Sequence, residues 1–317
     1  MSESPKTSDG AAPTFSVGGQ AVLEGVMMRA PLAWAVAVRR PDGQIEAIRN
    51  PLPRLSARSR LARIPFIRGV MVLGESLTLG YRALSWSAQK AGGEDEAELS
   101  KGQIVGSMTV ALVFFAALFI IAPAAAARAL TRDRSFVYAA VEGLIQLGIF
   151  LGYLWLLGRS QEISRVFSYH GAEHMAIHAY EAGDPLDVDR ISKYRPEHPR
   201  CGTSFLLLVM ILAIIIFGLL GRLSWPWLIA SRVLGIPVIA GISYEILKFS
   251  GTNQNNTIGR VLSAPGLWLQ RLTTRVPQFD QIEVAVASML SSLEEEQVAE
   301  VLARGPVPEA ALAARAH

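Results

Sequence analysis

The sequence predicts a mainly α-helical, polytopic membrane protein with about four transmembrane helices, a small N-terminal β element and helices on the cytoplasmic side. Hydrophobic residues make up 51% of the 317 residues and charged residues 18%, compared with about 25% charged residues in a typical soluble domain. The mean hydropathy is positive, at +0.32. Several apolar segments also approach the roughly 20 residues needed to cross a bilayer. These observations favour a membrane protein over a soluble one.

The N-terminal part of the chain is expected to begin with a disordered tail, because residues 1–14 are polar and lack the features of a signal peptide. Residues 15–100 are expected to form a β hairpin followed by an amphipathic helix. A Pro-Asp-Gly sequence at 41–43 separates two apolar or alternating runs, a pattern that indicates a hairpin turn. The folded region should therefore open with a small β element.

The amphipathic helix is predicted in the apolar stretch 64–88. Arg68, Glu75 and Arg82 recur there at seven-residue intervals, which places them near one helical face. This pattern favours a helix on the membrane surface, or one packed against the domain, over a lipid-exposed span.

The transmembrane region is predicted over residues 101–250. Its first apolar segment is uncharged, the second contains only Glu142, and the third is short and uncharged. The fourth contains Arg232, Glu245 and two prolines, which suggests a broken or partly interfacial span. The four segments are 104–127, 136–157, 204–220 and 223–247.

Basic residues predict the orientation, because short cytoplasmic connections are enriched in Lys and Arg. With four spans, the N-terminal region, a His-rich loop over 158–203 and the C-terminal part share one side. That side is richer in basic residues (Arg159, Arg165, Arg190, Lys193, Arg195, Arg200, Lys248, Arg260, Arg271 and Arg275) than the other (Arg128, Arg132, Arg134 and Arg222). The sequence therefore predicts an inner-membrane protein with both termini in the cytoplasm.

The C-terminal part is expected to be a cytoplasmic helical segment over 251–305 and a disordered tail over 306–317. The formal net charge of +3 is small, and the chain lacks blocks of Lys and Arg, so a nucleic-acid partner is not expected. The lipid bilayer is the partner that the sequence indicates. A single cysteine excludes an internal disulfide.

Candidate metal ligands are concentrated in the His-rich loop. His170, His174 and His178 recur every four residues, so they lie along one face of a helix. Two imidazoles at this spacing stand about 6 Å apart, and both can reach one Zn²⁺ at about 2.0–2.1 Å. The stretch from His170 to His174 also fits His-x-x-Glu-His, in which two histidines bind the metal and the glutamate, here Glu173, is the general base. The sequence thus predicts a divalent metal site, with zinc as the expected ion.

A third ligand must come from elsewhere, because His170 and His178 are separated by about 12 Å of helix rise. We expect His198 or Glu245 in this role. Cys201 and Glu24 are further candidates, the latter because an unpaired carboxylate in apolar surroundings is costly. Glu181 shares the histidine face and, with His178, would lie beside the first metal or at a second one.

Each of these residues also has a structural interpretation. A row of His and Glu on a helix at a bilayer surface can be a hydrated, hydrogen-bonded face. Cys201 alone is more often a small buried residue than a nucleophile. An ion pair of Glu245 with Arg232 or Lys248 would explain this residue about as well as a role in the site does.

Several stretches, taken in order, resemble the YqhQ-like family of bacterial multi-pass membrane proteins, a domain of unknown function often described as a predicted metal-dependent enzyme. The resemblance covers about Phe15 to Ala287, and it implies a membrane fold and a metal site without implying a substrate or reaction. It is carried by GGQAVLEGVMMRAP, IPFIRGV, YHGAEHMAIHAYE, HPRCGTSF, GISYE and LSAPGLWLQRLTTRVP.

The functional prediction is a metal-dependent membrane enzyme, a hydrolase that uses a metal-bound water at the cytoplasmic membrane surface on a membrane-embedded peptide or lipid. The alternative is a non-enzymatic membrane scaffold or assembly factor that recruits cytoplasmic partners. We also expect Glu24 and Arg29 to pack beside the 170–181 helix, since buried charges need partners. This packing should close one pocket at the bilayer surface. The segment 262–277, with two prolines, should form a loop followed by a short helix at the border of that pocket.

Overall fold

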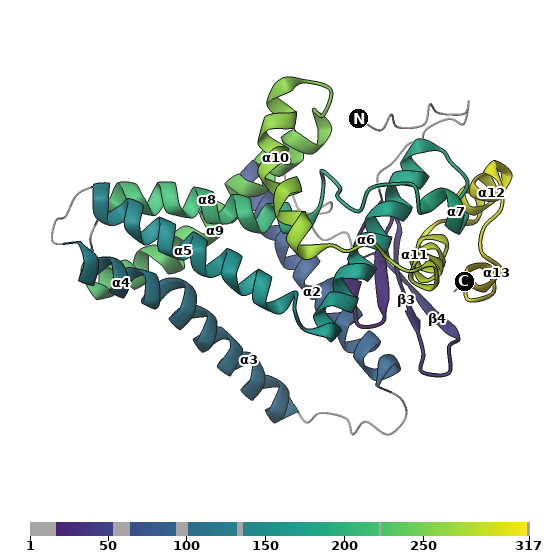
Figure 1. Cartoon of the computed structure of the whole chain (residues 1–317), viewed down its shortest axis with the longest axis horizontal. Coiled ribbons are helices and arrows are strands. Elements are labelled where there is room, and N and C mark those ends of the chain that lie inside the picture. The colour runs from purple at the N-terminus through teal and green to yellow at the C-terminus, as the bar shows by residue number, and fades with distance from the viewer. Residues whose placement is uncertain (1–16, 53–63, 93–100, 132–135, 222, 316–317) are drawn as a thin grey trace.

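The computed structural model describes residues 17–52, 64–92, 101–131, 136–221 and 223–315. The expected N-terminal tail lies outside these residues. The described chain is mainly helical, with one small antiparallel sheet (Figure 1). The helices α3, α4, α5, α8 and α9 form an elongated bundle, and the sheet lies beyond one end of it together with α6, α7, α11, α12 and α13 (Figure 1).

The sheet is a four-stranded meander in the order β1-β2-β3-β4, in which the expected hairpin is the β3–β4 pair. Its turn contains Gly43, whose φ of 85° lies in the left-handed region that glycine adopts easily. The sheet is larger than the single hairpin expected from the sequence, because β1 and β2 form a second hairpin before it. The strands are Gly18–Val22, Gly25–Arg29, Ala33–Arg39 and Ile45–Pro51.

Both faces of this sheet are buried. Val26 and Met28 face a core shared with α6 (Gln161–Ala182) and α11 (Phe279–Ser292), whereas Met27 belongs to a core shared with α2. A strand that is covered on both faces is apolar without alternation. This is why β2, with the sequence GVMMR, carries no alternating signal of its own.

Helix α2 spans Pro65–Ala91 and confirms the predicted amphipathic helix. It packs against β3 and against α9 (Trp225–Thr252). Two of its three regularly spaced charges are paired, Arg68 with Glu245 of α9 and Glu75 with Arg29 of β2. The helix thus joins the sheet to the bundle.

Four helices are long and apolar enough to cross a membrane, as the sequence predicts. The first is formed by α3 (Lys101–Ala116), the π-helical turn Ala117–Ile121 and α4 (Ala122–Leu130). The fourth, α9, is continuous through Pro237 rather than broken. The candidate spans are Gly106–Leu130, Val137–Leu157 of α5 (Phe136–Leu157), Gly202–Leu220 of α8 and Trp225–Thr252.

The His-rich segment 158–203 contains the helix predicted for the histidine row, α6, and the short α7 (Val188–Ile191). Another expectation differs from the structure. Residues 262–277 do not begin with a loop, because α10 (Thr257–Thr273) continues through Pro265. Proline leaves the carbonyl four residues earlier unbonded, and that residue, Val261, is 64% exposed.

The C-terminal tail is also more ordered than its composition suggests. After α12 (Glu295–Arg304), helix α13 occupies Glu309–Ala313, within the segment expected to be disordered. Ala311 is fully buried in the core that includes α11 and α12. Short Ala-rich helices are unstable alone, so this helix depends on a contact that the local sequence does not reveal.

Candidate metal centre

Helix α6 carries the histidine row and ends at Gly183, whose left-handed φ of 73° caps the helix. The helix lies between the sheet and the end of the bundle (Figure 1). Its middle is closely packed, since a Cβ on Gly171 would lie 2.0 Å from the carbonyl oxygen of Arg275. The segment after α10 therefore runs directly along α6.

Two histidines of the row are oriented by backbone carbonyls. The Nδ1 of His170 lies 2.9 Å from the carbonyl oxygen of Thr273, and the Nδ1 of His174 lies 2.6 Å from that of Pro196. A carbonyl can only accept, so each Nδ1 carries the proton. In a neutral imidazole this leaves Nε2 with a free lone pair. Metal-binding histidines in proteins are held in this way.

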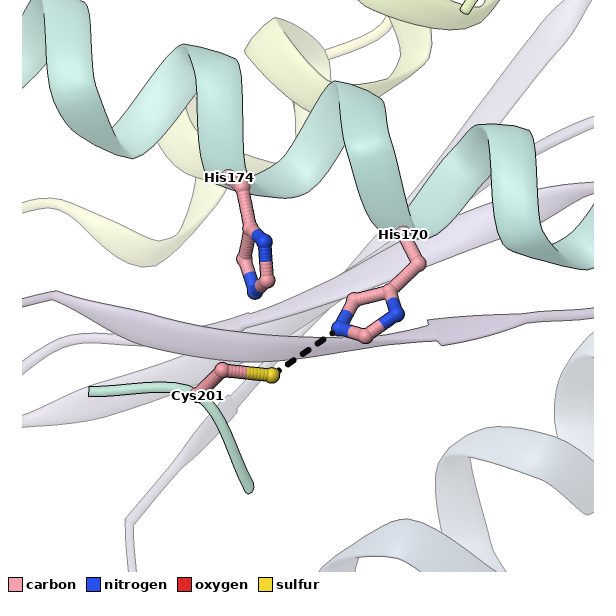
Figure 2. Close-up of side chains that lie close together, drawn as sticks. All are labelled: His170, His174 and Cys201. Carbon is pink, nitrogen blue, oxygen red and sulfur yellow. Dashed lines mark hydrogen bonds between the residues drawn. The ribbon is translucent and has the colours of Figure 1, made fainter. Parts of the chain in front are cut away.

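Cys201 lies opposite these two imidazoles and is the N-cap of α8 (Figure 2). Its Sγ is 3.2 Å from the Nε2 of His170, and it accepts a hydrogen bond from the backbone N–H of Thr203. Burial raises the pKa of the thiol, but His174 and Thr203 lower it, and the net shift is downward. A helix N-terminus favours the thiolate, which is the form that binds metals.

The ligand atoms of His170, His174 and Cys201 all lie within 4.8 Å of one another (Figure 2). The ring centroids of the two histidines are 4.4 Å apart. Two nitrogens and one sulfur are a donor set typical of a tetrahedral Zn²⁺ site whose fourth position is open. Among the described residues, this is the one group of three or more His, Cys, Asp or Glu side chains placed to hold an ion.

Glu245, one of the two residues expected as third ligand, lies elsewhere. Its Oε2 is 2.5 Å from a guanidinium nitrogen of Arg68 on α2, and Oε1 accepts from the Nε of the same arginine. Such a two-bond pair satisfies the carboxylate. The partner is neither Arg232 nor Lys248, because the packing of α2 against α9 brings Arg68 to it.

His198, the other expected ligand, lies close to the centre, but both of its ring nitrogens already have partners. Its Nδ1 accepts from the backbone N–H of Arg200, and its Nε2 is 3.4 Å from Oε2 of Glu181. Glu181 also pairs with Arg200. His198 is therefore part of a polar cluster beside the three-residue group and not a member of that group.

His178 belongs to the same cluster. Its Nε2 donates to the carbonyl oxygen of Glu197 at 2.9 Å, and its ring lies 4.5 Å from that of His198 between centroids. Burial lowers the pKa of both histidines to about 4. Both imidazoles are consequently neutral at pH 7 and extend the row beyond His174.

Glu173 is buried, at 3% exposure, and lies against β1. Its carboxylate accepts a hydrogen bond from the backbone N–H of Gly19, while Oε2 has no hydrogen-bond partner among the described residues. Burial raises the pKa of Glu173 to about 8, although His170 opposes this shift. An incompletely bonded buried carboxylate beside a ligand group is suited to proton transfer.

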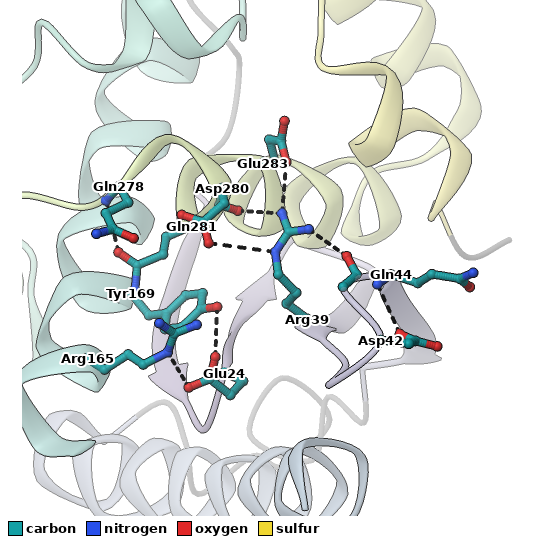
Figure 3. Close-up of polar contacts among 11 residues, drawn as sticks. Glu24, Arg39, Asp42, Gln44, Arg165, Tyr169, Gln278, Asp280, Gln281 and Glu283 are labelled. Carbon is teal, nitrogen blue, oxygen red and sulfur yellow. Dashed lines mark hydrogen bonds and ion pairs between the residues drawn. The ribbon is translucent and has the colours of Figure 1, made fainter. Parts of the chain in front are cut away.

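The N-terminal sheet contacts α6 through Glu24, at residues that precede the 170–181 stretch beside which Glu24 was expected. Glu24 accepts hydrogen bonds from the Nε of Arg165 and the hydroxyl of Tyr169 (Figure 3). Its φ of 51° is the one positive φ among the described non-glycine residues, a conformation that costs about 1–2 kcal/mol. Arg29, in contrast, turns to Glu75 of α2 and not to the histidine row.

Gln270 is a further residue at the site, which the sequence marked only as part of the family-like stretch 262–277 and not as a candidate site residue. Its side chain is fully buried and bonds both backbone groups of His198, accepting from the N–H at 2.7 Å and donating to the carbonyl oxygen at 2.9 Å. It also donates to Ser204. It thus holds the loop that carries Cys201. The available signal was its place in the family-like stretch 262–277, where it follows the apolar run Leu267–Leu269.

The fold and the ligand group define a class: a helical protein of membrane-spanning composition with a buried His-His-Cys group at one end of its bundle. The chain belongs to the family described as "Protein of unknown function (DUF1385)", which matches residues 64–295. It is 35% identical over 300 residues to "Uncharacterized protein YqhQ" of Bacillus subtilis (strain 168), covering 89% of this chain and 94% of that protein. The resemblance noted in the sequence is confirmed. No solved structure matches.

Proposed function

We propose that the protein is a metal-dependent hydrolase at the cytoplasmic surface of the inner membrane, and that His170, His174 and Cys201 hold a Zn²⁺ ion. The observation that supports this best is the shared orientation of the two imidazoles. Both Nδ1 atoms bind backbone carbonyls, which leaves both Nε2 atoms beside the thiol. A hydrated surface row of histidines would not need such an arrangement.

The donor set fits zinc and a catalytic role. Zn²⁺ prefers nitrogen and sulfur ligands, and catalytic zinc sites have three protein ligands. A zinc ion in such a site supplies a Lewis acid that lowers the pKa of a water molecule to about 7. Their nitrogens and sulfur already lie within 4.8 Å of one another, so modest side-chain movements would bring them to the Zn–N and Zn–S distances of about 2.0–2.3 Å.

Glu173 is proposed as the general base. It is adjacent to His174 in the His-x-x-Glu-His order, and its free Oε2 is buried. A carboxylate in this position takes the proton of the attacking water and returns it to the leaving group. A nearby cation lowers a carboxyl pKa, so an ion at the site would bring Glu173 into its basic form at neutral pH.

The position of the site favours a membrane-embedded substrate, either a peptide or a lipid. Cys201 directly precedes the candidate span Gly202–Leu220. A reaction centre at this point lies at the level where a bilayer meets water. A substrate in the membrane can approach it without leaving the lipid.

Elemental analysis of the purified protein tests the metal. We expect about one equivalent of zinc in the wild type, none in His174→Ala, and an unchanged content in the matched control His178→Ala, because His178 lies outside the ligand group. Wild-type protein without metal, even after incubation with Zn²⁺, would refute the proposal.

Glu173→Gln tests catalysis apart from metal binding. This variant should keep its zinc and lose hydrolysis of ester and peptide probes presented in vesicles. If it loses neither, Glu173 is not the base. If the wild type holds zinc but hydrolyses no probe, the metal is structural, and the protein is better described as a membrane scaffold.

A further inference from the structure

Helix α10 covers the end of the bundle that lies nearest the metal centre. A Cβ on Gly266 would lie 2.3 Å from the Oγ of Ser204, which is in the first turn of α8. A Cβ on Gly259 would lie 2.0 Å from the carbonyl oxygen of Asn253, which caps the end of α9. One candidate span begins at this level and another ends there. The helix therefore lies at the depth where a bilayer meets water.

The direction of α10 agrees with this depth. It runs across the direction of the bundle that α5, α8 and α9 form (Figure 1). A helix that crosses spans at their ends lies along the membrane surface and not through the membrane. This is the placement of an interfacial helix.

The two faces of α10 differ. One face is packed against the protein and carries Ser263, Gly266, Leu269, Gln270 and Thr273, all of which are buried.

The opposite face carries an exposed apolar stripe. Ile258 and Val261 are each 64% exposed, and Trp268, one further turn and a half along, is 51% exposed. Their spacing of three and seven residues keeps them on one side of the helix. Tryptophan is enriched where a membrane meets water, so this stripe is suited to the outer part of a lipid leaflet.

Arginines flank the apolar stripe along one edge. Arg260 and Arg271 are both exposed, and eleven residues, about three full turns, separate them, so they project from the same side of α10 about 16 Å apart. Neither has a carboxylate partner among the residues that the structure describes. The stretch 246–279 contains four basic residues and no Asp or Glu. This edge of the helix is therefore positively charged.

We infer that α10 lies in the leaflet surface on the side of the metal centre, and that Arg260 and Arg271 bind the headgroups of anionic phospholipids there. The apolar stripe buries its side chains among the upper parts of the acyl chains, while the arginines remain at the level of the phosphates. A soluble acidic protein would match the charge, but it would leave an apolar stripe at this depth unexplained.

The contact has a consequence for the metal centre. On its buried face, α10 carries Gln270, which bonds both backbone groups of His198, and the carbonyl of Thr273 orients His170. A lipid contact on the opposite face would thus fix the height of the metal centre relative to the membrane surface. The contact itself requires neither a metal nor a reaction, so its failure and that of the hydrolase proposal are separate.

Photocrosslinking tests the position of α10. The full-length protein is reconstituted in vesicles of phosphatidylcholine and phosphatidylglycerol that contain phosphatidylglycerol with a diazirine in its acyl chain. We expect labels at Ile258 and Trp268, and at Leu112 of α3, which is 69% exposed on a candidate span. Leu302 of α12 is apolar and 42% exposed but lies beyond the bundle, and it should stay unlabelled. Labelling of Leu112 without α10 would overturn the inference.

Lipid binding to arginine variants tests the headgroup. The detergent-solubilised protein is titrated with phosphatidylglycerol or phosphatidylcholine, and bound lipids are counted by native mass spectrometry. The wild type should prefer phosphatidylglycerol. Arg260→Gln with Arg271→Gln should weaken its binding by about fivefold per arginine and leave that of phosphatidylcholine unchanged. The matched pair Lys193→Gln with Arg195→Gln removes two exposed charges beside α7 and should keep the preference.

Three results would overturn the inference. A wild type without preference, although α10 is labelled, would show that the helix faces lipid without recognising its headgroup. Equal losses in the two variant pairs would mark a general effect of net charge. A label on α10 that appears in vesicles but is absent from native membranes, where Leu112 is still labelled, would show that another protein covers this face in the cell.

Discussion

The Nε2 of His170 lies 3.2 Å from the Sγ of Cys201, although 31 residues separate them in sequence. The two side chains are held by different elements. The carbonyl of Thr273 orients His170, and the start of α8 positions Cys201. The local sequence of neither element places the other side chain. The contact between His170 and Cys201 therefore depends on the packing of α6, α8 and the end of α10.

The first prediction concerns the thiol as a ligand. Protein loaded with Co²⁺ in place of zinc should show a sulfur-to-cobalt charge-transfer absorption, because Cys201 would bind as the thiolate. Cys201→Ser should lose this absorption, and His178→Ala should keep it. A wild-type spectrum without the band, or a band that survives in Cys201→Ser, would remove Cys201 from the site.

The second prediction concerns Gln270 as a positioning residue. Gln270→Leu leaves the N–H and carbonyl of His198 without their partner, and the loop that carries Cys201 should loosen. Loss of a supporting partner typically costs about 10–100-fold in metal affinity, to be measured by competition with a chelator. Gln146→Leu, whose glutamine bonds the distant carbonyl of Phe119, should leave affinity unchanged. Equal affinities in the two variants would show that Gln270 only supports the fold.

The spans and the histidine row could be predicted from the sequence because each depends on local periodicity. Apolar stretches of sufficient length with few charges identify the spans, and a four-residue repeat places His170 and His174 on one helical face. The partner of Glu245 could not be predicted in the same way. It depends on α2 lying along α9, and this contact has no signature near Glu245 itself.

Cys201 illustrates the same limit within the site. A lone cysteine is most often a buried apolar residue, and only its position as the N-cap of α8 and its contact with His170 distinguish it. Sequence reasoning therefore included it among the candidates but ranked it below His198. His198 is nearer to the row in sequence, but its two nitrogens are already engaged by Arg200 and Glu181.

The third prediction concerns the contact between α6 and the segment after α10. Gly171→Ala would place a Cβ 2.0 Å from the carbonyl oxygen of Arg275. Overpacking of this kind typically costs about 1–3 kcal/mol, so the free energy of unfolding in mixed micelles should fall. The matched Gly148→Ala, where nothing lies within 4 Å of the added Cβ, should be neutral or slightly stabilising. Equal stability of the two variants would contradict the close contact.

The fourth prediction concerns the pH dependence of stability. Burial lowers the pKa of His178 from 6.5 to about 4, so between these values the unfolded chain takes up a proton that the native protein does not. The free energy of unfolding should therefore fall as pH decreases from 6.5 to 4, with up to about 3 kcal/mol attributable to this residue. His178→Gln should reduce the slope in that window, and the slope that remains is expected from His198, whose pKa burial also lowers to about 4. A variant whose curve matches that of the wild type would show that His178 does not titrate as described.

The last prediction concerns the side of the membrane on which the metal centre lies. With four spans, Asp189 and Ser224, both exposed, lie on opposite sides, and the excess of basic residues predicts the cytoplasm for Asp189. In a Cys201→Ser background, Ser224→Cys should react with a membrane-impermeant maleimide in intact spheroplasts. Asp189→Cys should react only after permeabilisation. The reverse pattern would place the thiol of Cys201 on the oxidising side, where a free thiolate ligand is vulnerable, and would argue against the proposed site.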